Sequence, residues 1–371
     1  MKAPHLLWDL GAAYDLLVSL IILHDPARFG VRGLWAAGMR SRLPPGPRDF
    51  LAEVQNSVVR FVPLGWLYSL PDPKDGATLL WALEQVPPAA RLPAMALRYD
   101  APEPMVALLH EVAARGWWTA ADEETLWSTL DRAGMMPVPP RRSMSTLLRW
   151  WANAAEFGER YLEALQAYYD VFFAEEEQRI RPTLQQALAE AQLLADRLPL
   201  PRLLENLSQG VRFAALPDVS EVVLAPSYWS SPLLFYSQIG PDRWFFLFGA
   251  RPMDASLVPG EVVPEALTQT LKTLSDPTRL RILRYLSTQT LTPTELAQRL
   301  RLRSPTVVYH LNMLRMAGLV TVVMSEGSER GYAARLTQLG ELFRALEAFL
   351  ASPEAEDDPG AVAATPTSRV E

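Results

Sequence analysis

A short segment near the C-terminal end of the chain, from Ser304 to Asn312, carries side chains suited to contact DNA. Its hydroxyl, phenol and amide groups can exchange hydrogen bonds with base edges, and a valine among them can touch a thymine methyl group. Arginines nearby can bind phosphates, which position a protein on the duplex without reading its sequence. The predicted base contacts are Ser304, Thr306, Val308, Tyr309 and Asn312, and the predicted phosphate contacts are Arg301, Arg303 and Arg315.

These side chains can face DNA together only on a helix whose opposite face is buried. Val307, Leu311 and Leu314 follow the i, i+4, i+7 spacing of such a buried face. At 100° per residue, most of the base-contacting set then points outward. Gly318 lies where this helix should end in a left-handed residue.

Two further helices are predicted from their N-terminal residues. Asp276 and Thr292 can each cap a helix that has proline at its first position, and Glu295 completes a capping box with Thr292. Residues 319–324 and 332–336 are rich enough in strand-forming residues to predict a hairpin. Helix, helix–turn–helix and hairpin in this order predict a winged helix–turn–helix, whose recognition helix enters a DNA groove.

The segments 274–286 and 295–320 resemble the arsenical-resistance-repressor (ArsR) family of bacterial and archaeal transcription regulators. The resemblance covers about a fifth of the 371 residues. It implies a dimer that binds operator DNA, usually as a repressor released by an effector. The matching helix–turn–helix positions are Pro305, Thr306, Val307, His310, Leu311, Leu314, Gly318 and Leu319, and His310 joins the predicted DNA contacts.

Three features depart from the pattern of the family. Arg301 stands where many members have glycine in the turn, and Val308 stands where a serine often faces DNA. The wing tip contains Glu326 and Glu329, which repel phosphate, and Arg330 as its single basic residue. Arg330 is the one DNA contact predicted in the wing.

Metal sensing through cysteine thiolates, which many family members use, is excluded because the chain has no cysteine. Its four histidines lack the spacing of metal ligands, and we expect neither a metal nor another cofactor. Phosphate-binding glycine loops and nucleophile elbows are also absent from the sequence. We therefore predict no catalytic residue and do not expect an enzyme.

The net charge of −7 is distributed unevenly. Residues 265–350 hold 11 basic and 7 acidic side chains, a net charge of +4, whereas residues 351–371 hold 1 basic and 5 acidic ones, a net charge of −4. The positive charge thus lies on the predicted DNA reader. The apolar run Leu16–Leu23 is far shorter than the ~20 residues of a membrane span. We expect a cytoplasmic protein with no membrane partner.

The predicted fold class is mainly α with small antiparallel β elements. Residues 1–250 should form a helical domain whose helices are separated by prolines and which ends in a small antiparallel sheet within 219–250. Residues 251–264 are a predicted linker, 265–350 the winged helix–turn–helix and dimerisation domain, and 351–371 a disordered acidic tail. Helices are expected near 6–23, 49–61, 76–86, 104–115, 121–133 and 143–181.

Aromatic residues repeat along the helix predicted for 143–181 at spacings typical of one helical face. Such a stripe is either core packing or the wall of a pocket for an organic effector. As lining residues of that pocket we consider Trp150, Trp151, Tyr161, Tyr168 and Trp229.

The last helix of the predicted DNA reader carries more apolar side chains than one small module needs, and the first helix has leucines along one face. In the ArsR family these helices pair across the dimer, and packing on the N-terminal domain is the alternative. The predicted dimerisation residues are Leu267, Leu271, Leu339, Leu342, Phe343, Leu346 and Phe349.

These features predict a homodimeric, sequence-specific transcription regulator, and most simply a repressor, that binds an inverted repeat in double-stranded DNA. A small organic effector in the N-terminal domain could control it. One alternative is an interaction module whose N-terminal domain binds another protein. A second alternative is an enzyme fused to a DNA-binding domain.

Overall fold

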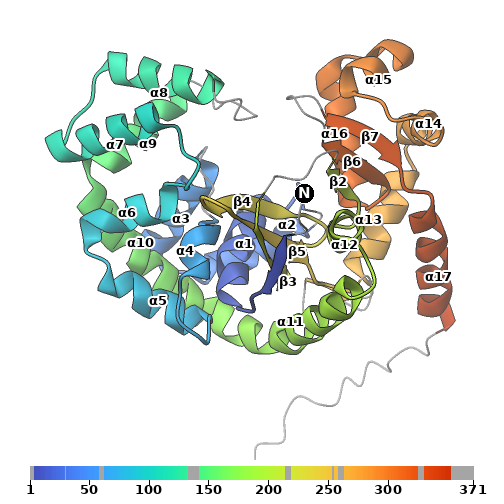
Figure 1. The fold of residues 1–371 in the computed structure, drawn as a ribbon, viewed down its shortest axis with the longest axis horizontal. Coiled ribbons are helices and arrows are strands. Elements are labelled where there is room, and N and C mark those ends of the chain that lie inside the picture. Colours follow the sequence, from blue (N-terminus) through green and yellow to red (C-terminus); the bar gives the residue numbers. More distant parts are fainter. Residues whose placement is uncertain are drawn as a thin grey trace, which may run out of the picture.

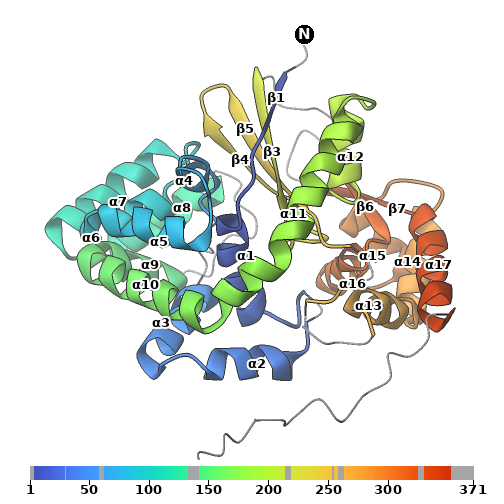
Figure 2. The same ribbon diagram turned by 90° about the horizontal axis from the view of Figure 1, so that it is seen from below.

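The computed structural model describes residues 4–29, 31–57, 62–132, 142–213, 219–252, 255–257, 263–324 and 330–351. A large N-terminal domain of helices around a sheet lies beside a C-terminal winged helix–turn–helix (Figures 1 and 2). The predicted fold class, mainly α with small β elements, is confirmed. The acidic residues of the wing tip and the predicted tail after residue 351 lie outside the described residues.

The N-terminal domain is built from short helices, as its prolines predict. They are α1 (Ala13–His24), α2 (Gly33–Ser41), α3 (Pro45–Asn56), α4 (Leu64–Tyr68), α5 (Gly76–Gln85), α6 (Pro88–Ala96), α7 (Glu103–Arg115) and α8 (Ala120–Arg132). The long helix expected for 143–181 is divided into α9 (Arg142–Ala152), α10 (Ala154–Tyr168), a π-helical turn η1 (Tyr169–Phe173) and α11 (Ala174–Ala195). Pro182 lies inside α11 without ending it, and α12 (Leu200–Leu207) follows.

The sheet of this domain differs from the antiparallel one predicted. Its strands β1 (His5–Trp8), β3 (Glu221–Ser227), β5 (Arg243–Gly249) and β4 (Phe235–Gly240) lie in the order β1-β3-β5-β4. The pairs β1–β3 and β3–β5 are parallel, and only the β4–β5 pair of this sheet is antiparallel. The prediction of a helix from residue 6 was wrong because β1 pairs with residues more than 200 positions away, which no local pattern reveals.

Both faces of the sheet are covered, which explains the apolar runs of its strands. On one face, Val223 and Phe245 belong to the main core of the helical domain. On the other, Val222 and Phe246 form a second core with Leu204 of α12. Helix α1 lies within the main core, and the apolar run predicted to be a buried helix is at most 3% exposed. No described helix is long and apolar enough to cross a membrane.

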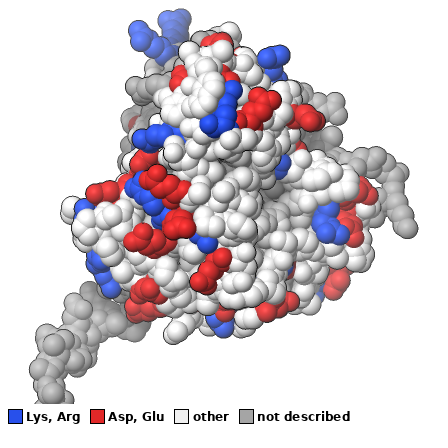
Figure 3. Space-filling view, turned by 90° about the vertical axis from the view of Figure 1, so that its left-hand side faces the viewer, with Lys and Arg blue, Asp and Glu red and all other residues white. Residues whose placement is uncertain are grey.

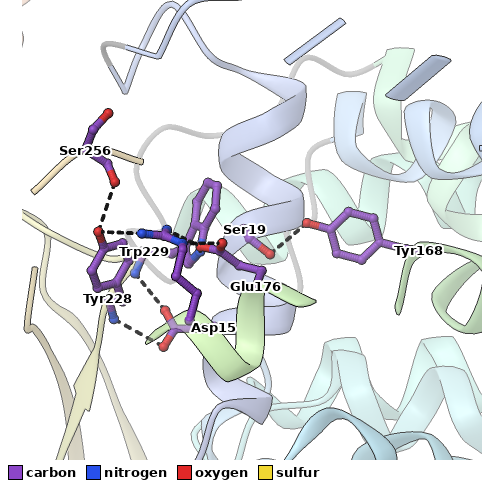
Figure 4. A network of polar contacts seen from close by, with 8 residues as sticks. Asp15, Ser19, Tyr168, Glu176, Tyr228, Trp229 and Ser256 are labelled. Atoms are coloured by element: carbon purple, nitrogen blue, oxygen red, sulfur yellow. Dashed lines mark hydrogen bonds and ion pairs between the residues drawn. The ribbon is translucent and has the colours of Figure 1, made fainter. Parts of the chain in front are cut away.

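A buried polar network joins α1, the end of β3 and α11 (Figure 4). The carboxylate of Asp15 accepts hydrogen bonds from Ser227 Oγ at 2.7 Å and from the backbone N–H groups of Tyr228 and Trp229 at 3.1 and 2.7 Å. The Trp229 indole N–H donates to Glu176 of α11 at 2.8 Å. Burial raises the pKa of Asp15 from 3.8 to about 7, although its three donors favour the charged form.

The winged helix–turn–helix follows the predicted order closely. It consists of α13 (Glu265–Leu274), α14 (Pro277–Leu286), α15 (Pro293–Leu300), α16 (Ser304–Met316), β6 (Val320–Met324), β7 (Arg330–Ala334) and α17 (Thr337–Ala351). Asp276 accepts from the first-turn N–H groups of α14, and Thr292 and Glu295 form the predicted capping box on α15. Val307, Leu311 and Leu314 are fully buried.

The strand β2 (Val211–Phe213) joins the two domains, because it is the third strand of the wing's sheet, in the order β2-β6-β7. It runs parallel to β6 of the wing, with Val211 opposite Val322 and Phe213 opposite Met324. The Phe213 ring packs edge-on against Phe246 of the first sheet, with ring centroids 5.7 Å apart. The backbone of β2 therefore belongs to the DNA-binding module, while its aromatic side chain belongs to the N-terminal domain.

Two arginines of the module reinforce this junction at the C-terminal end of α12. Arg315 of α16 donates to the carbonyl of Ser208 at 3.1 Å, and Arg335 donates to that of Gln209 at 2.7 Å. Cations favour the C-terminal end of a helix because its carbonyl groups carry partial negative charge. The arginines thus cap α12 from the neighbouring domain.

We expect the Asp15 network to make stability depend on pH. Between pH 4 and 7, Asp15 is protonated in the folded chain but ionised in the unfolded chain. Its contribution to the free energy of unfolding is therefore complete below about pH 4 and is lost as the pH rises through about 7. The change Asp15→Asn removes the titrating group and should flatten this part of the pH dependence, measured by urea unfolding between pH 4 and 8. Asp100→Asn, at a partly exposed ion pair with Arg98, is the control. Equal slopes in all three proteins would contradict the assignment.

We expect Arg315→Met to lower the free energy of unfolding by about 1–3 kcal/mol, because the buried carbonyl of Ser208 loses its donor. Urea unfolding measures this loss. The matched change Arg344→Met, at an exposed position on α17, should leave stability nearly unchanged. If the two variants were equally stable, Arg315 would not hold the junction together.

Candidate nucleic-acid interface

The N-terminal half of α16 presents the predicted base-contacting residues on its surface. Ser304, Thr306 and Asn312 are exposed, as are Val308 at 40% and Tyr309 at 58%. The exposed residues are opposite the buried face that packs in the core of the module. No described side chain caps the first turn of α16, where the N–H groups of Thr306 and Val307 donate to the carbonyl of Arg303.

Arg301 and Arg303 lie in the turn before α16, where both are exposed. Neither forms an ion pair in the part of the chain that the structure describes. Arg301 adopts the left-handed conformation, with φ of 55°, at the position where related proteins often have glycine. The strain is on the order of 1 kcal/mol, and it places a guanidinium group beside the recognition helix.

His310 faces the interior of the module more than its surface. It is half-buried, and its ring meets that of Tyr309 edge-on at 5.6 Å. Partial burial raises the pKa of Asp276, but hydrogen bonds from Arg279 and Thr278 and the charges of Arg279 and His310 lower it below its ordinary value. His310 therefore lies near the N-terminal cap of α14, where it can help to hold α16 in place.

Arg315 is not available to a phosphate in this structure. Its side chain is 8% exposed, and its guanidinium group reaches the carbonyls of Ser208 and Gln209. The predicted phosphate contact is therefore corrected to a contact between domains. The spacing of exposed residues along α16 could not reveal this interdomain contact, because Ser208 and Gln209 lie more than 100 residues earlier in the chain. Arg330, at the start of β7, is exposed and stays a predicted contact.

The predicted dimerisation residues differ in their exposure. Leu267 and Leu342 are buried within the chain, where α13 and α17 pack together. Leu271 and Phe343 are 37% and 55% exposed, while the other three are partly buried. Beside Phe343, an apolar groove of about 570 Å³ runs between α14 and α17 and is lined by Leu274, Leu280, Leu283, Arg284, Ser287, Leu336, Leu339 and Phe343.

The aromatic residues considered for an effector pocket are packed in the core. All five are at most 4% exposed. The Trp150 ring lies 5.2 Å from that of Phe157, and Trp229 meets Phe172 edge-on at 5.8 Å. Tyr168 shares a 2.8 Å hydrogen bond with Ser19 (Figure 4). These residues line neither the groove between α14 and α17 nor the small cavity between the two domains, so core packing accounts for their spacing.

Sequence reasoning missed the residues that join the module to the rest of the chain. These are Ser208 and Gln209 at the end of α12, the strand β2, and Arg335 after β7. The one local signal was Gly210, which has a φ of 105° and a backbone carbonyl that accepts from Val322 N–H at 2.9 Å. Among the described residues, no three His, Cys, Asp or Glu side chains gather closely enough to hold a metal ion.

Comparison with known proteins agrees with this geometry. A helix-turn-helix domain family matches residues 274–323. An ArsR-like transcriptional regulator of known structure from Rhodococcus sp. RHA1 is 34% identical, and the match covers 23% of this chain and 80% of that one, with a TM-score of 0.22. No curated protein matches the chain. The 34% identity over four-fifths of that regulator's length relates it to the C-terminal module of this chain. Through that module the chain belongs to the ArsR-like family of helix–turn–helix transcription regulators.

Proposed function

We propose that the protein is a homodimeric repressor that binds an inverted-repeat operator and answers to a small effector. The observation that carries this proposal is the exposed N-terminal half of α16, with Tyr309 and Asn312 outward beside Arg301 and Arg303. The module also carries a net charge of +4 in a chain of net charge −7. We assign no catalytic step to the chain.

The surface of the N-terminal domain supports placing the DNA contacts on the module. On the face turned away from α14–α17, acidic and basic side chains are interspersed (Figure 3). Such a face offers no extended basic surface to a phosphate backbone. This face is therefore not proposed for DNA contact, and the proposal centres the DNA-binding surface on α16.

The groove between α14 and α17 supports the homodimer. Leu280, Leu336 and Phe343 line it and are 49%, 53% and 55% exposed. Apolar side chains gathered in one groove are typical of a protein interface. A two-fold dimer that binds half-sites one turn of DNA apart needs its two recognition helices about 34–36 Å from each other.

Substitutions on α16 and in the turn before it should separate affinity from specificity. We expect Asn312→Ala to cost about 1–3 kcal/mol on the preferred site and to relax specificity there. Arg303→Met should weaken binding to all sequences and reduce the salt dependence by about one phosphate contact. Gel shifts at several salt concentrations, with preferred and scrambled duplexes, measure both effects. Arg344→Met is the control. Equal, sequence-blind losses in the two variants would overturn the assigned roles.

Substitution of Phe343 should test the dimer surface. We expect Phe343→Glu to weaken self-association by about a hundredfold or more, because a charge would be buried at the centre of an apolar contact. Analytical ultracentrifugation over a range of protein concentrations measures this. Leu350→Glu, on the same helix but outside the groove and 72% exposed, should leave the association unchanged. A monomeric wild-type chain, or no difference between the variants, would contradict the proposed surface.

A further inference from the structure

A small cavity lies where the N-terminal domain meets the end of the recognition helix. Its volume is about 60 Å³. Gln209 and Arg251 line it from the N-terminal domain, Gln269 from α13, Gln338 from α17, and Met316 to Gly318 from the end of α16. A molecule in this cavity would contact both domains and the C-terminal end of the recognition helix at once.

The lining of the cavity favours an anion. Arg251 supplies a guanidinium group, three glutamines supply amides, and Ser231 and Thr270 supply hydroxyl groups. Among the described residues, no aspartate or glutamate lines the cavity. Arg251 donates to the carbonyl of Ser231 at 3.3 Å, which holds the guanidinium group in the wall of the cavity. Guanidinium and amide groups are the partners that carboxylates and other oxyanions prefer.

Two arginines of the DNA-binding module, Arg315 and Arg335, meet at the junction around the cavity, where the charges of Glu341 and Glu205 also act on Arg335. Arg315 and Arg335 both donate to the carbonyl of Gln209, which lines the cavity. No carboxylate forms an ion pair with either arginine among the described residues. Burial, and after it the charge of Arg335, lower the pKa of Arg315 to about 10. An anion placed beside this pair would reduce their mutual repulsion.

The size of the cavity limits the ligand. A space of 60 Å³ corresponds to roughly four to six water molecules, at about 10–15 Å³ for each. Acetate and other short carboxylates fit this space, and so does phosphate. We propose that the cavity binds a small oxyanion of this size, and that the bound anion changes the affinity for DNA by linking the N-terminal domain to α16. The second part of this proposal rests on the proposed function.

Calorimetry of the full chain without DNA tests the site. Acetate, pyruvate and phosphate are titrated separately in a buffer whose other anion is chloride. We expect saturable binding of one equivalent of at least one of them, and the comparison shows whether carboxylate or phosphate is preferred. Arg251→Met should weaken binding about tenfold or more, because it removes a charged donor. Ala266→Leu, which fills the cavity but keeps every donor, should weaken it as strongly. Arg98→Met is the control at an exposed position.

The outcomes separate the site from the proposed function. Binding that is absent for all three anions, or equal in the wild type and both cavity variants, overturns the site whatever the protein does with DNA. Gel shifts at a saturating concentration of the anion then test the coupling. We expect at least a threefold change in DNA affinity that Ala266→Leu abolishes. Unchanged affinity despite calorimetric binding overturns the coupling alone. Failure of the wild type to bind DNA both with and without the anion overturns the proposed function and leaves the site standing.

Discussion

The pairing of β2 with β6 is the constraint on which the arrangement of this protein depends. Three residues of the N-terminal domain complete the sheet of the wing, and Phe213 anchors them in the first sheet. Arg315 and Arg335 add charged hydrogen bonds to the end of α12. An open edge of β6 would expose unpaired backbone groups, and β2 covers it. The DNA reader is therefore held by the large domain rather than tethered loosely to it.

This junction leaves one end of the recognition helix free and restrains the other. The first turns of α16 are exposed, while Arg315 near its C-terminal end is buried against α12. Helix α11 connects the same junction to the core, since Glu176 at its start holds Trp229 and its other end leads to α12. Packed and hydrogen-bonded elements thus connect Asp15 with the C-terminal end of α16.

The sequence predicted the DNA-binding module well because its signals are local. The caps at Asp276 and Thr292, the buried spacing of Val307, Leu311 and Leu314, and the turn at Gly318 each act within a few residues. The strand β1, the parallel sheet and the contacts of Arg315 could not be predicted in the same way. The partners of β1 and Arg315 lie 100 to more than 200 residues away, and the parallel strands β3 and β5 are separated in the chain by β4. An arginine on a helix also has the same local sequence pattern whether it contacts a phosphate or a carbonyl.

The aromatic stripe shows a second limit of prediction from the sequence. Trp150, Tyr161 and Tyr168 have a spacing that suits a pocket wall and a core equally, and the structure places them in the core.

The central claim, that α16 reads a specific DNA sequence from a two-fold dimer, is tested most directly by footprinting the purified protein on genomic DNA. The account predicts discrete sites containing two inverted half-sites about 10–10.5 base pairs apart, centre to centre. Uniform protection without a shared sequence would contradict it.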